Sequence, residues 1–186
     1  MHNREDTDLI NDILGGDSRA FADLVDKYQR RVYNFVVYTL RNQEDADEVA
    51  QDTFVKAYKG LSTFRGDSKF STWLLRIAYN TCMTRLRKVK PGMVDLVASG
   101  IDLDGGNNIL EQSDLEDMRS VLARAMAQLN QGDQALVTLY YYNEQSIKEI
   151  CEITSESESK IKVDLHRCRK KLLKILNQMG IKEWVS

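Results

Sequence analysis

The sequence is poor in the residues that build metal centres, disulfides and catalytic sites, with two histidines and three cysteines among 186 residues. Cys82, Cys151 and Cys168 lie far apart, and each falls within an apolar helical stripe, which indicates reduced, buried thiols in a cytoplasmic protein. No metal-ligand spacing, glycine-rich phosphate loop or nucleophile–base pairing is visible. We therefore expect no metal, no cofactor and no enzymatic activity.

Long apolar runs are missing too, since no stretch approaches the roughly 20 residues of a membrane span. The N-terminal residues 1–6 are polar and do not predict a signal peptide. The net charge is only −2, but the charges are unevenly placed. Residues 76–90 hold five cations and no acid, residues 160–174 hold seven cations and one acid, and residues 91–130 hold seven acids and two arginines. One basic run is usually a solvated helix face, whereas two favour an interaction with nucleic acid.

Apolar residues recur at helical spacing through most of the chain, which predicts an all-α fold. The exception is the segment 91–110, which contains the only proline and several glycines and has no helical period. It predicts a flexible linker between two small helical domains, residues 1–90 and residues 111–186. In the first domain we expect helices within residues 1–16, from Asp17 or Ser18 to Leu40, over residues 44–61 and from Thr72 to Lys90.

The helix expected over residues 44–61 has two distinct faces. Its apolar face includes Phe54 and Tyr58, which we expect to be buried. Acidic side chains cover the outer face and continue to Asp52. Acids in a first helical turn favour the helix dipole, but this cluster extends further than that effect requires. The outer face is therefore either solvated or a contact surface.

The most informative stretch is residues 64–73 with the helix that follows. Gly66 and its polar neighbours predict a tight loop, and Ser71 or Thr72 is a natural N-cap. One face of the helix carries an aromatic, an amide and guanidinium groups at steps of three and four residues. Such a face, beside phenylalanines in the loop, suits unstacked bases on a phosphate backbone. The alternative is that these aromatic side chains cap a small helical core.

A second motif lies near the C-terminus. Ser146 and Glu149 fit a capping box, a three-residue turn follows, and Ser157 can cap a longer basic helix. A short helix, a turn and a basic helix predict a helix-turn-helix. Other helical hairpins can produce the same pattern.

Both motifs resemble one protein family. The run FRGDSKFSTWLLRIAYNTCMTRLRK is similar to the promoter −10 segment of extracytoplasmic-function (ECF, group IV) RNA polymerase sigma factors of the sigma-70 family, and SIKEICEITSESESKIKVDLHRCRKKL resembles their −35-binding region. DADEVAQDTF matches the family motif that docks on a coiled coil of the polymerase beta-prime subunit. The resemblance covers roughly residues 10–90 and 112–176.

The resemblance implies a sigma factor that binds core RNA polymerase and directs initiation at promoter DNA, with residues 1–90 as region 2 and 111–186 as region 4. It implies core-polymerase contacts by Asp47, Glu48, Gln51 and Asp52. It implies −10 contacts by Phe64, Arg65, Asp67, Ser68, Phe70, Trp73, Arg76, Asn80 and Arg87. It implies −35 contacts by Ser157, Ser159, Lys160, Lys162, Val163, Arg167 and Lys171.

The family often works with an anti-sigma factor, in some cases membrane-anchored, and often in stress or envelope responses. The sequence departs from the family at Ser155, where a glycine is usual, at Glu156, usually apolar, and at Asp164, usually basic or polar. We expect Asp164 to pair with Lys160 or Arg167. Two alternatives are a helix-turn-helix regulator that never touches polymerase, which leaves the acidic face and the aromatic loop unexplained, and an adaptor without DNA affinity.

Overall fold

The computed structural model describes residues 5–88 and 120–181, and all regular elements in these two ranges are helices. The first range holds α1 (Asp6–Leu14), α2 (Ala20–Leu40), α3 (Gln43–Gly60), the 3-10 turn η1 (Leu61–Thr63) and α4 (Phe70–Lys88). The second holds a helical stretch at 120–126, α6 (Gln131–Val137), the π-helical turn η2 (Thr138–Tyr142), α7 (Ile147–Thr154) and α8 (Glu158–Gln178). The all-α prediction is confirmed. The expected linker, 91–110, lies outside the described residues.

Several helix ends follow directly from local sequence. The first helix ends at Leu14 with Gly15 as its C-cap, within the expected range 1–16. The Asn42 side chain accepts a hydrogen bond from the Asp45 N–H at 2.9 Å and so caps α3. The predicted capping box is present at α7, where Ser146 and Glu149 satisfy each other's backbone amides. The expected cap of α8 by Ser157 is also confirmed.

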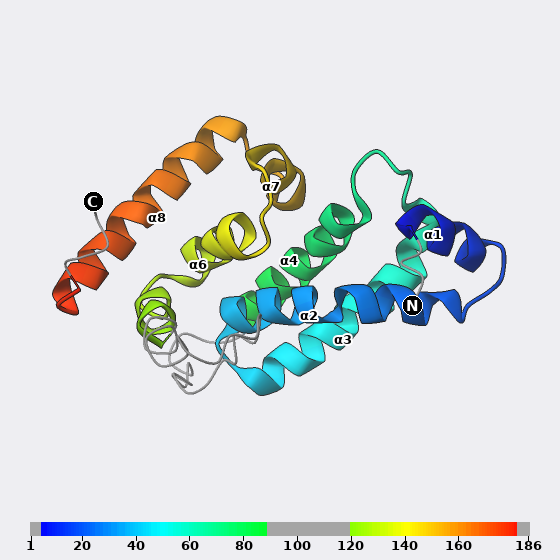
Figure 1. The fold of residues 1–186 in the computed structure, drawn as a ribbon, viewed down its shortest axis with the longest axis horizontal. Coiled ribbons are helices and arrows are strands. Elements are labelled where there is room, and N and C mark those ends of the chain that lie inside the picture. Colours follow the sequence, from blue (N-terminus) through cyan, green and yellow to red (C-terminus); the bar gives the residue numbers. More distant parts are fainter. Residues whose placement is uncertain (1–4, 89–119, 182–186) are drawn as a thin grey trace, which may run out of the picture.

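Helices α2, α3 and α4 form the centre of the N-terminal half, and α1 packs on α2 (Figure 1). Their shared core includes the fully buried Phe35, Val36 and Ala78. Tyr58 was predicted to be buried, but it is 47% exposed and meets Phe21 edge to face with ring centroids 5.0 Å apart. The end of α3 therefore presents its tyrosine to solvent.

The start of α4 differs from the prediction. The helix begins at Phe70, because the Lys69 carbonyl accepts hydrogen bonds from Thr72 N–H at 3.0 Å and Trp73 N–H at 3.1 Å. Ser71 and Thr72 are buried inside the first turn and are not the N-cap. The preceding loop turns at Gly66, whose φ of 77° is a left-handed conformation that glycine adopts without strain.

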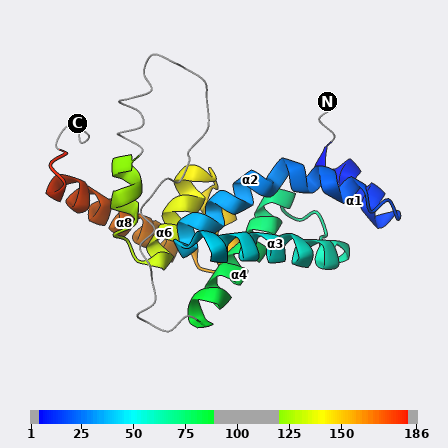
Figure 2. The same cartoon turned by 90° about the horizontal axis from the view of Figure 1, so that it is seen from below.

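The two halves of the chain pack against each other, and their buried residues form one continuous core. Helix α7 lies between α4 and α8, and α6 and η2 pack on α2 (Figures 1 and 2). The Arg41 guanidinium, next to the end of α2, donates to Gln134 at 2.6 Å and to the backbone carbonyl of Leu129. The sequence predicted two separate helical domains and did not predict this contact.

Candidate nucleic-acid interface

Four aromatic rings meet where the loop 64–69 joins α4. The Phe64 ring lies 5.4 Å from Trp73 and 5.7 Å from Phe70, and Phe70 lies 5.6 Å from Trp73 and 5.4 Å from Tyr28, centroid to centroid. Tyr28 and Phe70 belong to the core, whereas Phe64 and Trp73 are only partly buried. The buried rings therefore hold the outer two in a fixed position at the surface. The core interpretation is confirmed for Phe70, and base contact by Phe64 and Trp73 stays a prediction.

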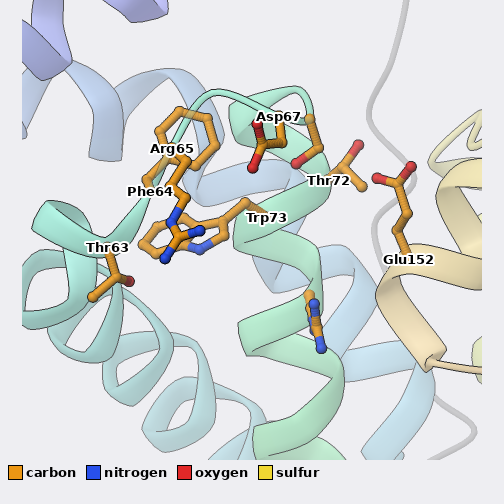
Figure 3. Close-up of a pocket in the computed structure, with 9 residues that line it drawn as sticks. Thr63, Phe64, Arg65, Asp67, Thr72, Trp73 and Glu152 are labelled. Carbon is orange, nitrogen blue, oxygen red and sulfur yellow. The ribbon is translucent and has the colours of Figure 1, made fainter.

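Trp73 separates two open clefts. The first, of about 410 Å³, is lined by the loop 64–69 and by Arg76, and it is shown in Figure 3. The second, of about 490 Å³, runs along α4 past Asn80 and Thr84 and is lined on its other side by Lys56 of α3. Both clefts place an indole next to a guanidinium. Such clefts can accept a flat base and its phosphate.

The structure brings together most of the predicted −10 residues. Around the first cleft lie Phe64, Arg65, Asp67, Ser68, Trp73 and Arg76, and the second adds Asn80. Phe70 is a correction, because its ring is 3% exposed in the core and is not presented to a ligand. Arg87 is exposed but lines neither cleft, and it lies about 21 Å along α4 from Trp73 at 1.5 Å per residue.

The acidic outer face of α3 is exposed as the pattern indicated. Asp47, Glu48 and Gln51 are at the surface, and Asp52 is partly exposed. Two of the carboxylates are paired within the chain: Asp52 with Lys56 at 2.7 Å, and Glu48 with Arg85 at 3.1 Å. Exposed pairs of this kind contribute only about 0–1 kcal/mol, so a basic partner can replace them.

The predicted −35 residues all lie on the exposed side of α8 or at its cap, namely Ser157, Ser159, Lys160, Lys162, Val163, Arg167 and Lys171. The lysines are partly neutralised by the chain itself. Lys160 pairs with Glu156 at 2.6 Å and Lys162 with Glu158 at 2.5 Å, while Lys171 pairs with Asp133 of α6.

Asp164 pairs with Arg167 and approaches Lys160 at 4.0 Å, which confirms the expected pairing. The turn between α7 and α8 contains Ser155, which is the C-cap of α7. Ser155 occupies the left-handed position with φ of 62°, where the family usually has a glycine.

The cysteines are free thiols, and Cys82 and Cys168 are buried as expected, while Cys151 is partly exposed. Burial raises the pKa of the Cys82 thiol to about 12, which keeps it protonated. Among the described residues no group of three or more histidine, cysteine or acidic side chains is placed to hold a metal ion. Within the two described ranges no helix has the length and apolarity that crossing a bilayer requires.

Several residues that line the clefts were not predicted as contacts from the sequence, and they include Thr63, Lys56 and Glu152. Thr63 lines both clefts, and Lys56 lines the second. Glu152 reaches the first cleft from α7, and Figure 3 shows it extending toward Thr72 on α4. The position of Lys56 four residues after Asp52 predicts the ion pair between the two side chains, but not the place of Lys56 at a cleft between α3 and α4. No local pattern could have identified Glu152, because its position depends on tertiary packing.

Known proteins are similar to this chain over most of its length. The family Sigma-70 region 2 matches residues 24–91, and the family Sigma-70, region 4 matches residues 119–172. The chain is 31% identical over 179 residues to the ECF RNA polymerase sigma factor SigW of Bacillus subtilis (strain 168), covering 91% of this chain and 96% of SigW. It is 30% identical over 184 residues to the RNA polymerase sigma-H factor of Pseudomonas aeruginosa, covering 94% and 95% of the two chains.

The fold also resembles a solved structure, the sigma factor RpoE in complex with the anti-sigma factor NepR from Bartonella quintana. The TM-score is 0.69 at 18% identity, and the match covers 84% of this chain and 96% of that one.

Proposed function

This chain belongs to the extracytoplasmic-function group of the sigma-70 family of RNA polymerase sigma factors, and from that premise we propose how its surfaces divide the work of promoter-specific initiation. The alternative of a helix-turn-helix regulator is not favoured, because both sigma regions match and the similarity to sigma factors covers almost the whole chain. The protein acts in the cytoplasm as a specificity subunit and catalyses no reaction itself. Its partners are core RNA polymerase, promoter DNA and an anti-sigma factor.

The observation that carries the division of roles is the pair of clefts around Trp73. The indole and the Phe64 ring offer stacking surfaces for bases of an opened −10 strand, and Asn80 offers an amide for a base edge. Arg65 and Arg76 lie beside them, where they can neutralise phosphates. Residues 1–90 are thus the part of the chain that opens the −10 element. Arg87, further along α4, contacts the same DNA strand.

The acidic face of α3 is the core-polymerase surface. Asp47, Glu48, Gln51 and Asp52 lie on one exposed side of a rigid helix, and a basic coiled coil would be complementary to that side. The basic side of α8 reads −35 duplex, as the recognition helix of residues 111–186. Ser157, Ser159 and Lys160 at its N-terminal end approach base edges, whereas Arg167 and Lys171 neutralise phosphates.

Reconstitution with core RNA polymerase tests these roles in one experiment. Asp52→Arg should weaken binding to core, because it places like charges together, and its thermal stability should stay near wild type. Asn80→Ala should leave core binding intact but impair opening of the −10 region, seen by permanganate footprinting, with a loss of about 1–3 kcal/mol.

Asp26→Arg and Asn11→Ala are matched controls, since both positions are exposed and lie outside all three surfaces. Wild-type core affinity in Asp52→Arg would overturn the docking surface. Unimpaired melting in Asn80→Ala would overturn the role of the clefts.

A further inference from the structure

Val163 is an apolar side chain on the outer side of α8. It is 57% exposed, which makes it the most exposed of the large apolar side chains in the described parts of the chain. Helix α8 packs on α6 and α7, and its buried residues Ile161, Leu165 and Cys168 are at most 3% exposed. Val163 lies about 140–160° around the helix axis from all three, at 3.6 residues per turn. Its isopropyl group therefore contributes nothing to the core.

A single exposed apolar side chain is common on a protein surface, but the neighbours of Val163 give this one a particular setting. The two nearest lysines are held by carboxylates that lie four residues earlier in the sequence. Lys160 pairs with Glu156 at 2.6 Å, and Lys162 pairs with Glu158 at 2.5 Å. Both ion pairs direct the ammonium group toward the N-terminal end of α8 and away from Val163.

The residues one turn before and one turn after Val163 also leave it accessible. Ser159 has a short side chain, and its hydroxyl lies 3.3 Å from the hydroxyl of Ser157. Arg167 pairs with Asp164, whose side chain is only 17% exposed. The outer side of α8 therefore carries one apolar group, with polar side chains around it.

The position of Val163 along α8 suits contact with a base. It lies five residues after Glu158, the first residue of the helix, and the N-terminal residues of a recognition helix contact base edges in the major groove. The base edges there carry hydrogen-bond donors and acceptors, and thymine alone adds an apolar group, its 5-methyl. A donor or acceptor placed against the isopropyl group would lose its hydrogen bond to water without gaining another. The thymine methyl has no such cost.

We propose that Val163 is a specificity-determining residue, which selects thymine at one position of the −35 element by packing its methyl groups on the 5-methyl group of that base. The inference rests on the proposed role of α8 in reading −35 duplex. It adds a preferred base at one position and names the side chain that prefers it.

Replacing thymine by uracil tests the contact, because it removes the methyl group and keeps the hydrogen-bonding edge of the base. Holoenzyme reconstituted from the full chain and core polymerase first selects its −35 sequence from a randomised duplex. Each thymine of the selected element, on either strand, is then replaced singly by deoxyuridine. One replacement should weaken binding about threefold to fivefold, the effect of exposing one methyl group again.

The same pair of duplexes is then bound to holoenzymes that carry variants of α8. Val163→Ala should bind the thymine and uracil duplexes almost equally, because it lacks the isopropyl group. Its thermal stability should stay near wild type, since the side chain is exposed. Lys171→Ala is the control, because loss of a phosphate contact should weaken both duplexes by the same factor.

Two results would overturn the inference alone. One is a selected −35 element in which no thymine responds to the replacement by uracil. The other is a response of equal size in wild type and Val163→Ala. A holoenzyme that selects no −35 sequence at all would overturn the proposed role of α8, and the inference would fail with it.

Discussion

At the scale of single residues, three non-glycine residues within the described ranges 5–88 and 120–181 adopt left-handed backbone conformations: Arg41, Glu144 and Ser155. Arg41 and Ser155 each stand at the C-terminal end of a helix, where glycine is the usual residue. An L-residue in this conformation costs roughly 1–2 kcal/mol. At Arg41 the hydrogen bonds of the guanidinium offset that cost, whereas the Ser155 side chain has a 3.5 Å contact with Arg76.

Ser155→Gly should therefore raise the free energy of unfolding by up to about 1 kcal/mol, because the relief of strain exceeds the extra freedom of glycine in the unfolded chain. Urea denaturation followed by circular dichroism measures this change. Ser155→Ala keeps the strain and serves as the control, for which no gain is expected. Equal stability of the glycine and alanine variants would contradict the strain at this turn.

Glu149 makes a pH-dependent contribution to stability. Burial alone would raise the pKa of its carboxyl group, but hydrogen bonds from Lys69 and Ser146 outweigh burial and lower that pKa to about 2. A folded-state pKa below the unfolded value of about 4.3 means that the charge stabilises the fold above that value, and that this stabilisation is lost as the pH falls toward 2.

Glu149→Gln should accordingly lower the free energy of unfolding at pH 7, because it removes the charged form that the fold stabilises. The difference from wild type should shrink below about pH 4 and vanish near pH 2. Urea titrations at pH 7, 4 and 3 measure it. A difference that stays constant over this range would show that the carboxylate charge is not involved.

At the scale of elements, the sequence predicted the helices better than it predicted which residues pack around them. Periodicity and capping residues were sufficient for α1, α7 and the cap of α8, because these signals lie within a few residues of each other. Ser71 and Thr72 look like caps but are buried, because the partner of Thr72 is Gln145, 73 residues away. The burial of Phe70 likewise depends on Tyr28 of α2. A local sequence pattern holds no information about contact partners that lie so far away along the chain.

The two ends of α8 should respond differently to substitution. In the reconstituted holoenzyme, Lys160→Ala should change which −35 sequences are preferred, because the N-terminal end of a recognition helix approaches base edges. Lys171→Ala should weaken all sequences alike and reduce the salt slope by about one. Binding-site selection measures the preference, and a salt titration measures the slope.

Lys171 also ties α8 to Asp133 of α6, so its variant should lose some thermal stability that Lys160→Ala does not. An unchanged sequence preference in Lys160→Ala would mean that a different part of α8 enters the groove.

At the scale of the whole molecule, the two halves share a core that neither sequence composition nor periodicity predicted. Arg31 donates to the Asn143 side chain at 3.3 Å across 112 residues of sequence, and Tyr38 packs on Tyr142 with ring centroids 5.0 Å apart. Arg41 is the central polar link, since it reaches Gln134 and two backbone carbonyls of the other half. These contacts predict that the halves unfold together.

Arg41→Ala should test this coupling. Losing the hydrogen bonds of a partly buried guanidinium should lower the free energy of unfolding by about 1–3 kcal/mol. Arg30→Ala, on an exposed side of α2, should change it by less than about 0.5 kcal/mol. Urea denaturation of both variants decides the matter, and equal stabilities would show that Arg41 does not join the halves.

The packing of α7 on α4 also has a consequence that depends on the order in which the chain is made. About 60 residues separate the end of α4 from the start of α7, and a ribosome adds about 5–20 residues per second, so α7 is synthesised roughly 3–12 s after α4. During that interval the nascent chain already contains the loop, Trp73 and the cations of the cleft, but not α7, which packs on α4 in the complete chain. Each newly made molecule therefore passes through a short period in which this end of α4 has no helix of the C-terminal half packed on it.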